Sequence, residues 1–436
     1  MTNSTALVSV SVMYRPLHFP TSGGPATARV PAPGLWRRRA GLEKIAPVTC
    51  STDGHLATMR VPVAACRHVY AVSDLHVEHA QNWEWLQGLR AEHYANDVLI
   101  VAGDVADRLD TFEASMTMLT EVFQLVFYVP GNHELWLRRD GSEGDTSLEK
   151  LQLLEQVCRR LGVITSPQRV QLIQGCVHIC PLVSFYHTSF DTEPNVETLR
   201  LPSVQRAMAD WRACRFPPSL ECGSESLAIH IDRYNTLMLR ASAAQAAVHP
   251  SLTAWRRWNE GRATNEPLVT FSHFLPRIEL CPEKRFLRYP DLMKAVGSAP
   301  LGRRVRSLRP DVHVFGHTHF GWDAQLDGTR YVQAALATPE ERRYRMKSLA
   351  IGSIDHGPLQ LFDGERRAFC PPRHAAWSTY YSLHARTPDV TFPAPWVLDH
   401  YRKRAPSRVR LERANEGIED GPATGTGTGT GLGWVK

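Results

Sequence analysis

The chain has 436 residues, of which 43% are hydrophobic and 22% are charged, a composition typical of a folded protein with a sizeable core. Its net charge of +6 is not gathered into one long basic run, so it argues weakly for anionic substrates and only faintly for nucleic acid, which is an unlikely partner but not an excluded one. No apolar run is long enough to span a bilayer, so we expect no contact with a membrane.

The N-terminal segment differs in composition from the rest of the chain. Residues 1–42 contain five Arg but no Asp or Glu, and they are rich in Ser, Thr, Ala and Pro, which is typical of an organelle transit peptide. The sequence Val48-Thr-Cys50 resembles a plastid processing site. We therefore expect residues 1–65 to be a disordered leader that directs the protein to the chloroplast. The alternative is a disordered leader that carries no targeting signal, on a protein that stays in the cytoplasm.

Five short apolar stretches, each stopped by Gly, Pro or a polar turn, predict buried strands; they cover residues 68–72, 97–102, 125–129, 268–271 and 312–315. Each strand leads into a block of polar residues; the blocks are Asp74-Leu-His76, Gly103-Asp-Val-Ala-Asp107, Gly131-Asn-His-Glu134, Ser272-His273 and Gly316-His-Thr-His319. Ligands of open α/β sheets bind beyond the carboxyl ends of the strands, so we expect the five blocks to meet in one site.

The blocks offer two Asp, one Asn and four His as metal ligands: Asp74, His76, Asp104, Asn132, His273, His317 and His319. This mixture of oxygen and nitrogen ligands suits Mn, Fe or Zn better than Ca or an all-oxygen Mg site. Residues i and i+2 of an extended segment point to the same side, so Asp74 and His76 face one region. Asp74 and Asp104 as helix N-caps, and Asn132 as a turn residue, are the alternatives, but they leave His76 and the Gly-His-Thr-His block unexplained.

Taken in this order, the blocks resemble those of the calcineurin-like metallophosphoesterase family. Residues 271–277 and 314–322 are similar to uncharacterised plant, algal and protist members. The resemblance implies an α/β fold, a two-sheet αββα sandwich of the metallo-dependent phosphatase type. Leu109 stands where the Ser/Thr protein phosphatases have Gly, and no His-Gly-Gly is present, so the chain is placed with the broader family.

The resemblance also implies a division of the ligands between two metals. Asp104 bridges both metals; one is completed by Asp74, His76 and His319, and the other by Asn132, His273 and His317. The family pattern further places Asp107 beside His133. A carboxylate bonded to an imidazole raises the pKa of the imidazole and orients the ring, so His133 is the candidate general acid for the leaving oxygen, or a stabiliser of the phosphoryl group.

The implied reaction is hydrolysis of a phosphate ester by a hydroxide activated between two metals. We expect a phosphomonoesterase acting on a phosphorylated small molecule or protein; the alternatives are a phosphodiesterase or nuclease, and a catalytically silent scaffold used for binding. Basic residues near the blocks are candidates for a phosphate clamp: Arg108, Arg138, Arg139 and Arg277.

The remaining segments complete the expected organisation. The catalytic domain covers residues 66–364 and carries an insertion at residues 141–267. In the insertion, Thr146-Ser-Leu-Glu149 predicts a capping box that opens a helix, and Pro181–His187 predicts a strand. After that strand, Tyr186, His187 and Asp191 either reach the site or form plain loop structure.

Two C-terminal segments follow the catalytic domain. Residues 365–405 form an aromatic-rich extension that we expect to pack on the domain, and residues 406–436 a disordered Thr/Gly tail. The nine Cys include no Cys-x-x-Cys, which favours free thiols and a reducing compartment.

Overall fold

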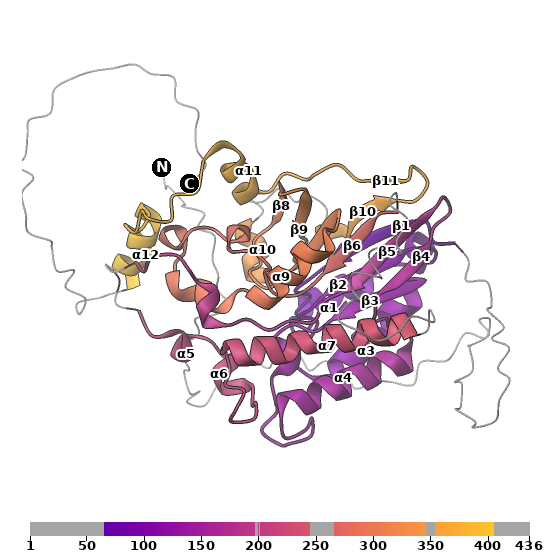
Figure 1. The fold of residues 1–436 in the computed structure, drawn as a ribbon, viewed down its shortest axis with the longest axis horizontal. Coiled ribbons are helices and arrows are strands. Elements are labelled where there is room, and N and C mark those ends of the chain that lie inside the picture. The colour runs from indigo at the N-terminus through magenta and orange to yellow at the C-terminus, as the bar shows by residue number, and fades with distance from the viewer. Residues whose placement is uncertain (1–64, 197–198, 200, 245–265, 346–353, 405–436) are drawn as a thin grey trace, which may run out of the picture.

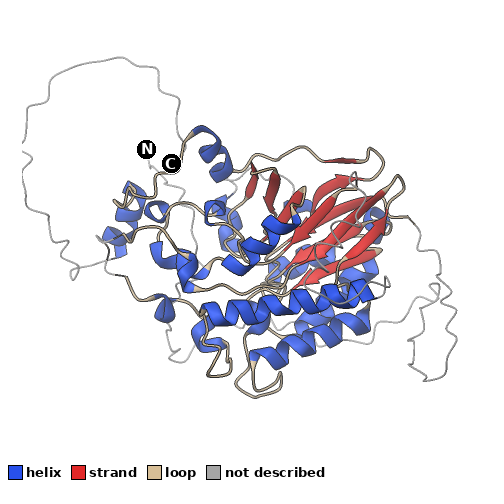
Figure 2. Cartoon of the chain, viewed as in Figure 1, coloured by secondary structure: helices blue, strands red, loops and turns tan. Residues whose placement is uncertain are grey.

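The computed structural model describes residues 65–404, except for residues 197–198, 200, 245–265 and 346–353. The expected leader, apart from Ala65, and the expected Thr/Gly tail lie outside the described residues. Within them, two β-sheets are flanked by helices (Figure 2). The predicted two-sheet α/β sandwich is therefore confirmed.

The first sheet has the strand order β11-β10-β1-β2-β3. Its strands are β1 (His68–Val72), β2 (Val98–Ala102), β3 (Leu125–Val129), β10 (Leu359–Asp363) and β11 (Ala368–Phe369). β1, β2 and β3 are parallel, while β10 pairs antiparallel with both β1 and β11. The ends of β1, β2 and β3 therefore point the same way, and the first three polar blocks follow these ends.

The second sheet has the order β4-β5-β6-β7-β9-β8. Its strands are β4 (Gln168–Gln171), β5 (Cys176–Pro181), β6 (Leu268–Phe271), β7 (Val312–Phe315), β8 (Trp322–Leu326) and β9 (Thr329–Gln333). The four inner strands, β5, β6, β7 and β9, run parallel. The edge strand β4 is antiparallel to β5, and the edge strand β8 is antiparallel to β9. The last two polar blocks follow β6 and β7.

All five strands predicted ahead of the polar blocks are present, as β1, β2, β3, β6 and β7. The strand predicted over Pro181–His187 is wrong, because β5 ends at Pro181, where that strand was expected to begin. A side chain takes the place of a neighbouring strand there: Asn235 accepts the N–H of Val183 at 2.7 Å and donates to its carbonyl at 2.8 Å.

Alternation of side chains divides the core in two. On the second sheet, Ile179 and Val314 pack into a core shared with the first sheet, whereas their neighbours Cys180 and Phe315 pack into a separate core beneath α9 (Ala299–Leu308). Successive residues of a strand point to opposite faces, so the four inner strands β5, β6, β7 and β9 each contribute to both cores. The sheet is covered on both faces, and its strand ends are held firmly.

The other helices lie between and after these strands. They are α1 (Ala80–Gly88), α2 (Ala91–Tyr94), α3 (Leu109–Val122), α4 (Ser147–Leu161), α5 (Val204–Ala207), α6 (Asp210–Ala213), α7 (Glu225–Ala244), α10 (Pro339–Arg345), α11 (Ala376–Leu383) and α12 (Pro395–Arg404). Short 3-10 helices are η2 (His133–Leu135), η3 (Thr188–Phe190), η4 (Ile278–Leu280), η5 (Lys284–Phe286), η6 (Pro290–Ala295) and η7 (Ile354–His356). The predicted capping box is present, since the Thr146 side chain accepts the N–H of Glu149 at 3.2 Å.

The C-terminal helices α11 and α12 lie on the side of the molecule away from β4 (Figure 1). α11 contacts β8, and the Tyr381 hydroxyl accepts the N–H of Glu283 at 3.0 Å. The eight described cysteines are free thiols. Within the described ranges, the helices are all too short or too polar to cross a membrane.

Candidate metal centre

The loops that follow β1, β2, β3, β6 and β7 meet where the two sheets come together. The parallel strands of both sheets deliver their polar blocks to one place, and the seven predicted ligands are all at least 95% buried. Polar side chains are buried at this density only when they have partners, so the arrangement is a site rather than a stretch of solvated surface.

A first cluster contains Asp74, His76, Asp104 and His319. One ligand atom from each of the four lies within 4.8 Å of all the others. The Nε2 atoms of His76 and His319 are 3.0 Å apart, and Nε2 of His319 is 3.3 Å from Oδ1 of Asp74. Two imidazole nitrogens at this distance leave space for a single proton or a cation between them.

A second cluster contains Asp104, Asn132, His273 and His317. Nε2 of His273 lies 3.3 Å from Oδ2 of Asp104 and 3.2 Å from Oδ1 of Asn132. The same Asn132 oxygen lies 3.1 Å from Nδ1 of His317. Asp104 belongs to both clusters, so the division implied by the family resemblance matches the way the fold groups these side chains. Their roles as ligands remain predictions.

The outward-facing nitrogens of the first cluster's imidazoles contact carboxylates. Nδ1 of His76 lies 3.1 Å from Oε1 of Glu78, and Nδ1 of His319 lies 2.8 Å from Oε2 of Glu341. An imidazole that donates outward to a carboxylate turns its other nitrogen, and that nitrogen's lone pair, inward. Sequence reasoning missed both carboxylates. Glu78 continues the i, i+2 spacing of Asp74 and His76, a signal that could have found it.

Backbone carbonyls orient the second cluster's imidazoles in the same way. Nδ1 of His273 lies 2.9 Å from the carbonyl of Ala102, and Nε2 of His317 lies 2.8 Å from that of Ala295. All four rings are therefore fixed with one nitrogen on the interior of the site, which is how metal-binding histidines are usually held. The donor set and its orientation fit a pair of metal ions.

Charge pairing within the clusters shifts several pKa values. Burial acts to raise the pKa of Asp74 and of Asp104, but nearby imidazoles outweigh it and hold both pKa values below their usual range. Burial acts to lower the pKa of His319, but Glu341 and Asp74 raise that pKa to about 10. Asp104 likewise raises the pKa of His273 to about 9 against the effect of burial. A metal must therefore displace protons from these imidazoles.

The backbone around the clusters is strained. Five predicted ligands have positive φ angles, which are uncommon for residues other than Gly: Asp74 (54°), His76 (43°), Asp104 (53°), His317 (75°) and His319 (55°). Such conformations persist only when the surrounding structure enforces them, and they concentrate at functional sites.

Close packing supplies part of this enforcement. A Cβ on Gly103 would lie 2.6 Å from Nδ1 of His273, and one on Gly131 would lie 2.1 Å from Oδ1 of Asp104. The buried carboxylate of Glu134 accepts backbone N–H groups from Gly131 at 2.7 Å and from Asp104 at 3.0 Å. Glu134 thus joins the second block to the third.

The predicted pairing of His133 with Asp107 is wrong. Nδ1 of His133 is buried without a hydrogen-bond partner among the described residues, and its Nε2 faces Asp104 at 3.9 Å. No hydrogen bond within the described ranges joins the Asp107 side chain to His133. The backbone carbonyl of Asp107 accepts from the buried Lys150 at 2.6 Å, which fixes this loop separately. Burial lowers the pKa of His133 to about 4, and the attraction of the nearby Asp104 carboxylate is too weak to offset it.

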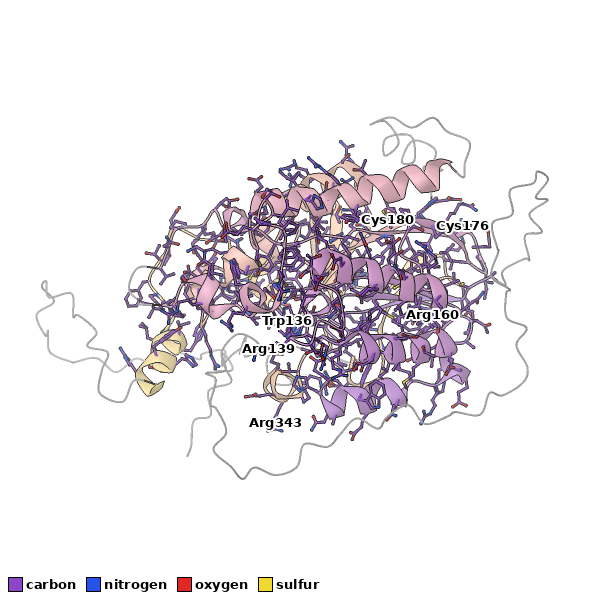
Figure 3. All side chains as sticks on the ribbon, turned by 90° about the horizontal axis from the view of Figure 1, so that it is seen from below. Trp136, Arg139, Arg160, Cys176, Cys180 and Arg343 are labelled. Atoms are coloured by element: carbon purple, nitrogen blue, oxygen red, sulfur yellow. The ribbon has the colours of Figure 1, made fainter. Side chains whose placement is uncertain are left out.

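A small, partly open pocket lies beside the clusters. Its lining combines ligand candidates with Trp136 and residues of the insertion: Asp104, Asn132, His133, Trp136, Met208, Ala209, Asp210, His317 and His319. The Trp136 ring stacks on His133 with the ring centroids 3.8 Å apart. Figure 3 shows Trp136 and Arg139 toward the middle of the molecule and Cys176, on β5, toward one end. The insertion therefore forms part of the pocket wall.

Of the three insertion residues that the sequence suggested for the site, one lies at the site and two lie elsewhere in the fold. Tyr186 lies at the site, because its hydroxyl donates to Asp210 at 2.8 Å. His187 does not, since its Nε2 accepts the N–H of Ala299 at the start of α9. Asp191 forms a buried ion pair with Lys284 at 2.6 Å. Asp210 was missed, because nothing in the sequence links it to the third block.

Comparison with known proteins agrees with this geometry. Residues 67–321 match the model of the calcineurin-like phosphoesterase family. The chain is 27% identical over 280 residues to the [acyl-carrier-protein] phosphodiesterase PptH of Mycobacterium tuberculosis, a match that covers 64% of this chain and 80% of that protein.

Solved structures are similar as well. The crystal structure of the phosphopantetheinyl hydrolase PptH from M. tuberculosis matches with a TM-score of 0.46 and 27% identity, over 64% of this chain and 93% of that one. TT1561 of Thermus thermophilus matches with a TM-score of 0.36 and 13% identity, over 72% of this chain and 100% of that one. With the family model covering more than half of its residues, the chain belongs to the calcineurin-like phosphoesterases and is a hydrolase that acts on phosphoric ester bonds.

Proposed function

We propose that this enzyme hydrolyses phosphodiesters, and that its natural substrate is the phosphodiester linking a phosphopantetheinyl group to a carrier protein. The observation that carries the first part is the lining of the pocket. Trp136, Met208 and Ala209 form its wall beside the imidazoles, and no Lys or Arg lines the part of it that the structure describes.

The charge of the substrate makes this lining informative. A phosphomonoester carries between one and two negative charges at neutral pH and gains from cationic side chains placed around it, as in arginine and lysine clamps. A phosphodiester carries a single charge and a second organic substituent, which needs uncharged surface. An aromatic and apolar wall beside the metal centre favours the diester.

The pairing of the arginines that were candidates for a phosphate clamp also favours a diester substrate. Arg108 pairs with Asp110, Arg138 with Asp140, and Arg277 with Glu279 and Asp327. None of these three, and not Arg139 either, is among the residues that line the pocket. The expected clamp is therefore not formed by these side chains. Hydrolysis of phosphomonoesters, which the sequence led us to expect, is the alternative that the test must distinguish from diester hydrolysis.

The carrier-protein part of the proposal is supported by the relative. PptH is named as a phosphodiesterase of acyl carrier protein and as a phosphopantetheinyl hydrolase, and it is 27% identical to this chain. A pantetheine arm is uncharged along most of its length, so it suits the wall formed by Trp136 and Met208.

The residues of the site have distinct tasks in such a reaction. Metal ions held by the two clusters would neutralise the phosphoryl oxygens and make water a better nucleophile near neutral pH. Asp104 holds the two halves of the site together. His133, which stacks on the Trp136 ring, presents an imidazole N–H to a phosphoryl oxygen. Trp136 and Met208 exclude water from the leaving group's side.

The test compares matched esters on the purified full chain. Metal content is measured first, and then hydrolysis of bis(4-nitrophenyl) phosphate beside 4-nitrophenyl phosphate, with Asp104→Asn as the control for a contaminating enzyme. We expect the diester to react faster, and a preference for the monoester would overturn the proposal. Metal-loaded protein with no turnover of either ester would mark a silent scaffold.

The natural substrate needs its own assay. A carrier protein bearing phosphopantetheine is incubated with the enzyme, and mass spectrometry follows loss of the group from its serine. Hydrolysis of the nitrophenyl diester without release of phosphopantetheine would retain the phosphodiesterase and reject the carrier-protein substrate.

A further inference from the structure

One buried carboxylate of the insertion contacts the metal centre from outside. Asp210 is the first residue of α6 and lies 78 residues along the chain from Asn132. Its side chain is completely buried. An ionised carboxylate in such a place is tolerated only when hydrogen bonds replace its water shell, so its partners indicate what it is there to do.

Asp210 accepts three hydrogen bonds, two of them from residues that line the pocket. Its Oδ1 accepts from Nδ2 of Asn132 at 2.9 Å and from Nε1 of Trp136 at 2.6 Å. Its Oδ2 accepts from the Tyr186 hydroxyl at 2.8 Å. Asn132 and Trp136 flank the short helix η2, and Tyr186 follows β5, so the Asp210 carboxylate joins its own segment to two others.

The bond to Asn132 determines which end of the amide enters the second cluster. Because the NH₂ group donates to Asp210, the amide oxygen is the atom that faces Nε2 of His273 at 3.2 Å and Nδ1 of His317 at 3.1 Å. With the amide turned over, an NH₂ group would point at a bound cation and could not act as a ligand. Asp210 therefore holds the amide in the orientation that can bind a metal.

The other two bonds position two aromatic side chains, one near each of two different histidines of the site. Trp136 stacks on His133, with the ring centroids 3.8 Å apart and the planes at 29°. The Tyr186 ring lies nearly parallel to that of His317, with centroids 6.2 Å apart and planes at 26°. Each aromatic ring that Asp210 anchors thus lies against a histidine of the site.

We propose that Asp210 is a positioning residue for the second metal, acting through the amide of Asn132. By this device the insertion, which the motif blocks do not include, controls one half of the two-metal site. The proposal rests on the two clusters and does not depend on which ester is hydrolysed.

The decisive measurement is metal binding, made without substrate. The metal-free full chain is titrated with Mn²⁺ or Zn²⁺, and bound metal per chain is determined after desalting. Loss of a residue that orients a metal ligand typically lowers affinity about 10- to 100-fold. We expect Asp210→Ala to weaken one of two binding steps by about that factor, while the other step is unchanged.

Further variants separate positioning from general stability. Asp210→Asn keeps an oxygen that can accept from Asn132 and Trp136, so it should recover most of the affinity that Asp210→Ala loses. Tyr186→Phe removes one hydrogen bond and leaves the amide of Asn132 fixed, so both binding steps should remain close to wild type. Asp191→Asn is the matched control, since it neutralises another buried carboxylate of the insertion away from the site.

The outcomes decide the proposal in every case. If Asp210→Ala binds both metals as tightly as wild type, the proposal is overturned. It is also overturned if Asp191→Asn weakens the same single step to the same extent, because the effect would then come from general destabilisation. If Asp210→Ala does not fold, Asp210→Asn decides: a small weakening confined to one step supports the proposal, and equal weakening of both steps, or no weakening of either, rejects it.

Discussion

Replacing His133 with Asn tests how this imidazole takes part in the reaction. Nδ1 of His133 has no carboxylate partner within the described residues, and burial lowers the pKa of the ring to about 4. At pH 7 about one ring in a thousand is protonated, and protonation costs roughly 4 kcal/mol. General acid catalysis is typically worth about 10²- to 10⁴-fold, or roughly 3 to 5 kcal/mol, so this cost removes most of the benefit.

A neutral imidazole still donates a hydrogen bond to a phosphoryl oxygen. A hydrogen bond to a charged group contributes about 1.5 to 3 kcal/mol. We therefore expect His133→Asn to slow hydrolysis about 10- to 150-fold. The loss should be the same for an alkyl ester and for a nitrophenyl ester, because no proton is given to the leaving oxygen.

The assay measures kcat for alkyl and nitrophenyl diesters on protein of known metal content. Asp107→Asn is the matched control and should leave both rates close to wild type, since its side chain is not bonded to His133. A much larger loss on the alkyl ester would show that His133 is a general acid after all and refute the reasoning. Loss of a metal from His133→Asn would make it a ligand, which its position near His76 and Glu78 allows.

Other predictions follow from the clusters, their charges and the leader. Asp104→Asn should abolish activity and release at least one metal, because its carboxylate belongs to both clusters; two retained metals with near-normal turnover would disprove the shared position. Gly131→Ala should also lower metal content, because its Cβ would lie 2.1 Å from Oδ1 of Asp104. The raised pKa values of His273 and His319, about 9 and about 10, mean that both are protonated at pH 7 and compete with the metal. Metal uptake should therefore release protons, and its affinity should rise with pH up to these values; calorimetry in buffers of different ionisation enthalpy measures this, and uptake without proton release would contradict it. Deleting residues 1–65 should leave activity intact, and the same segment fused to a reporter should enter chloroplasts; a cytosolic signal would reject the localisation.

The strands and the blocks that follow them could be predicted because both depend on neighbouring residues. A short apolar run rich in β-branched residues is typical of a strand buried on both faces, so Val98–Ala102 or Leu268–Phe271 can be recognised without knowing its partners. A polar block that follows such a run lies at the carboxyl end of its strand by geometry alone. This local logic brought Asp74, Asp104 and His273 to one place.

Tertiary structure decided which groups surround the ligand candidates. Asp107 is the last residue of the second block, yet it makes no hydrogen bond to His133, whereas Glu341 and Asp210 reach His319 and Asn132 from other segments. The strand expected at Pro181–His187 failed for the same reason, because hydrogen bonds from α7 replaced those of a neighbouring strand. A hydrogen bond depends on where two atoms lie after the whole chain has packed, and no spacing along the sequence records that position.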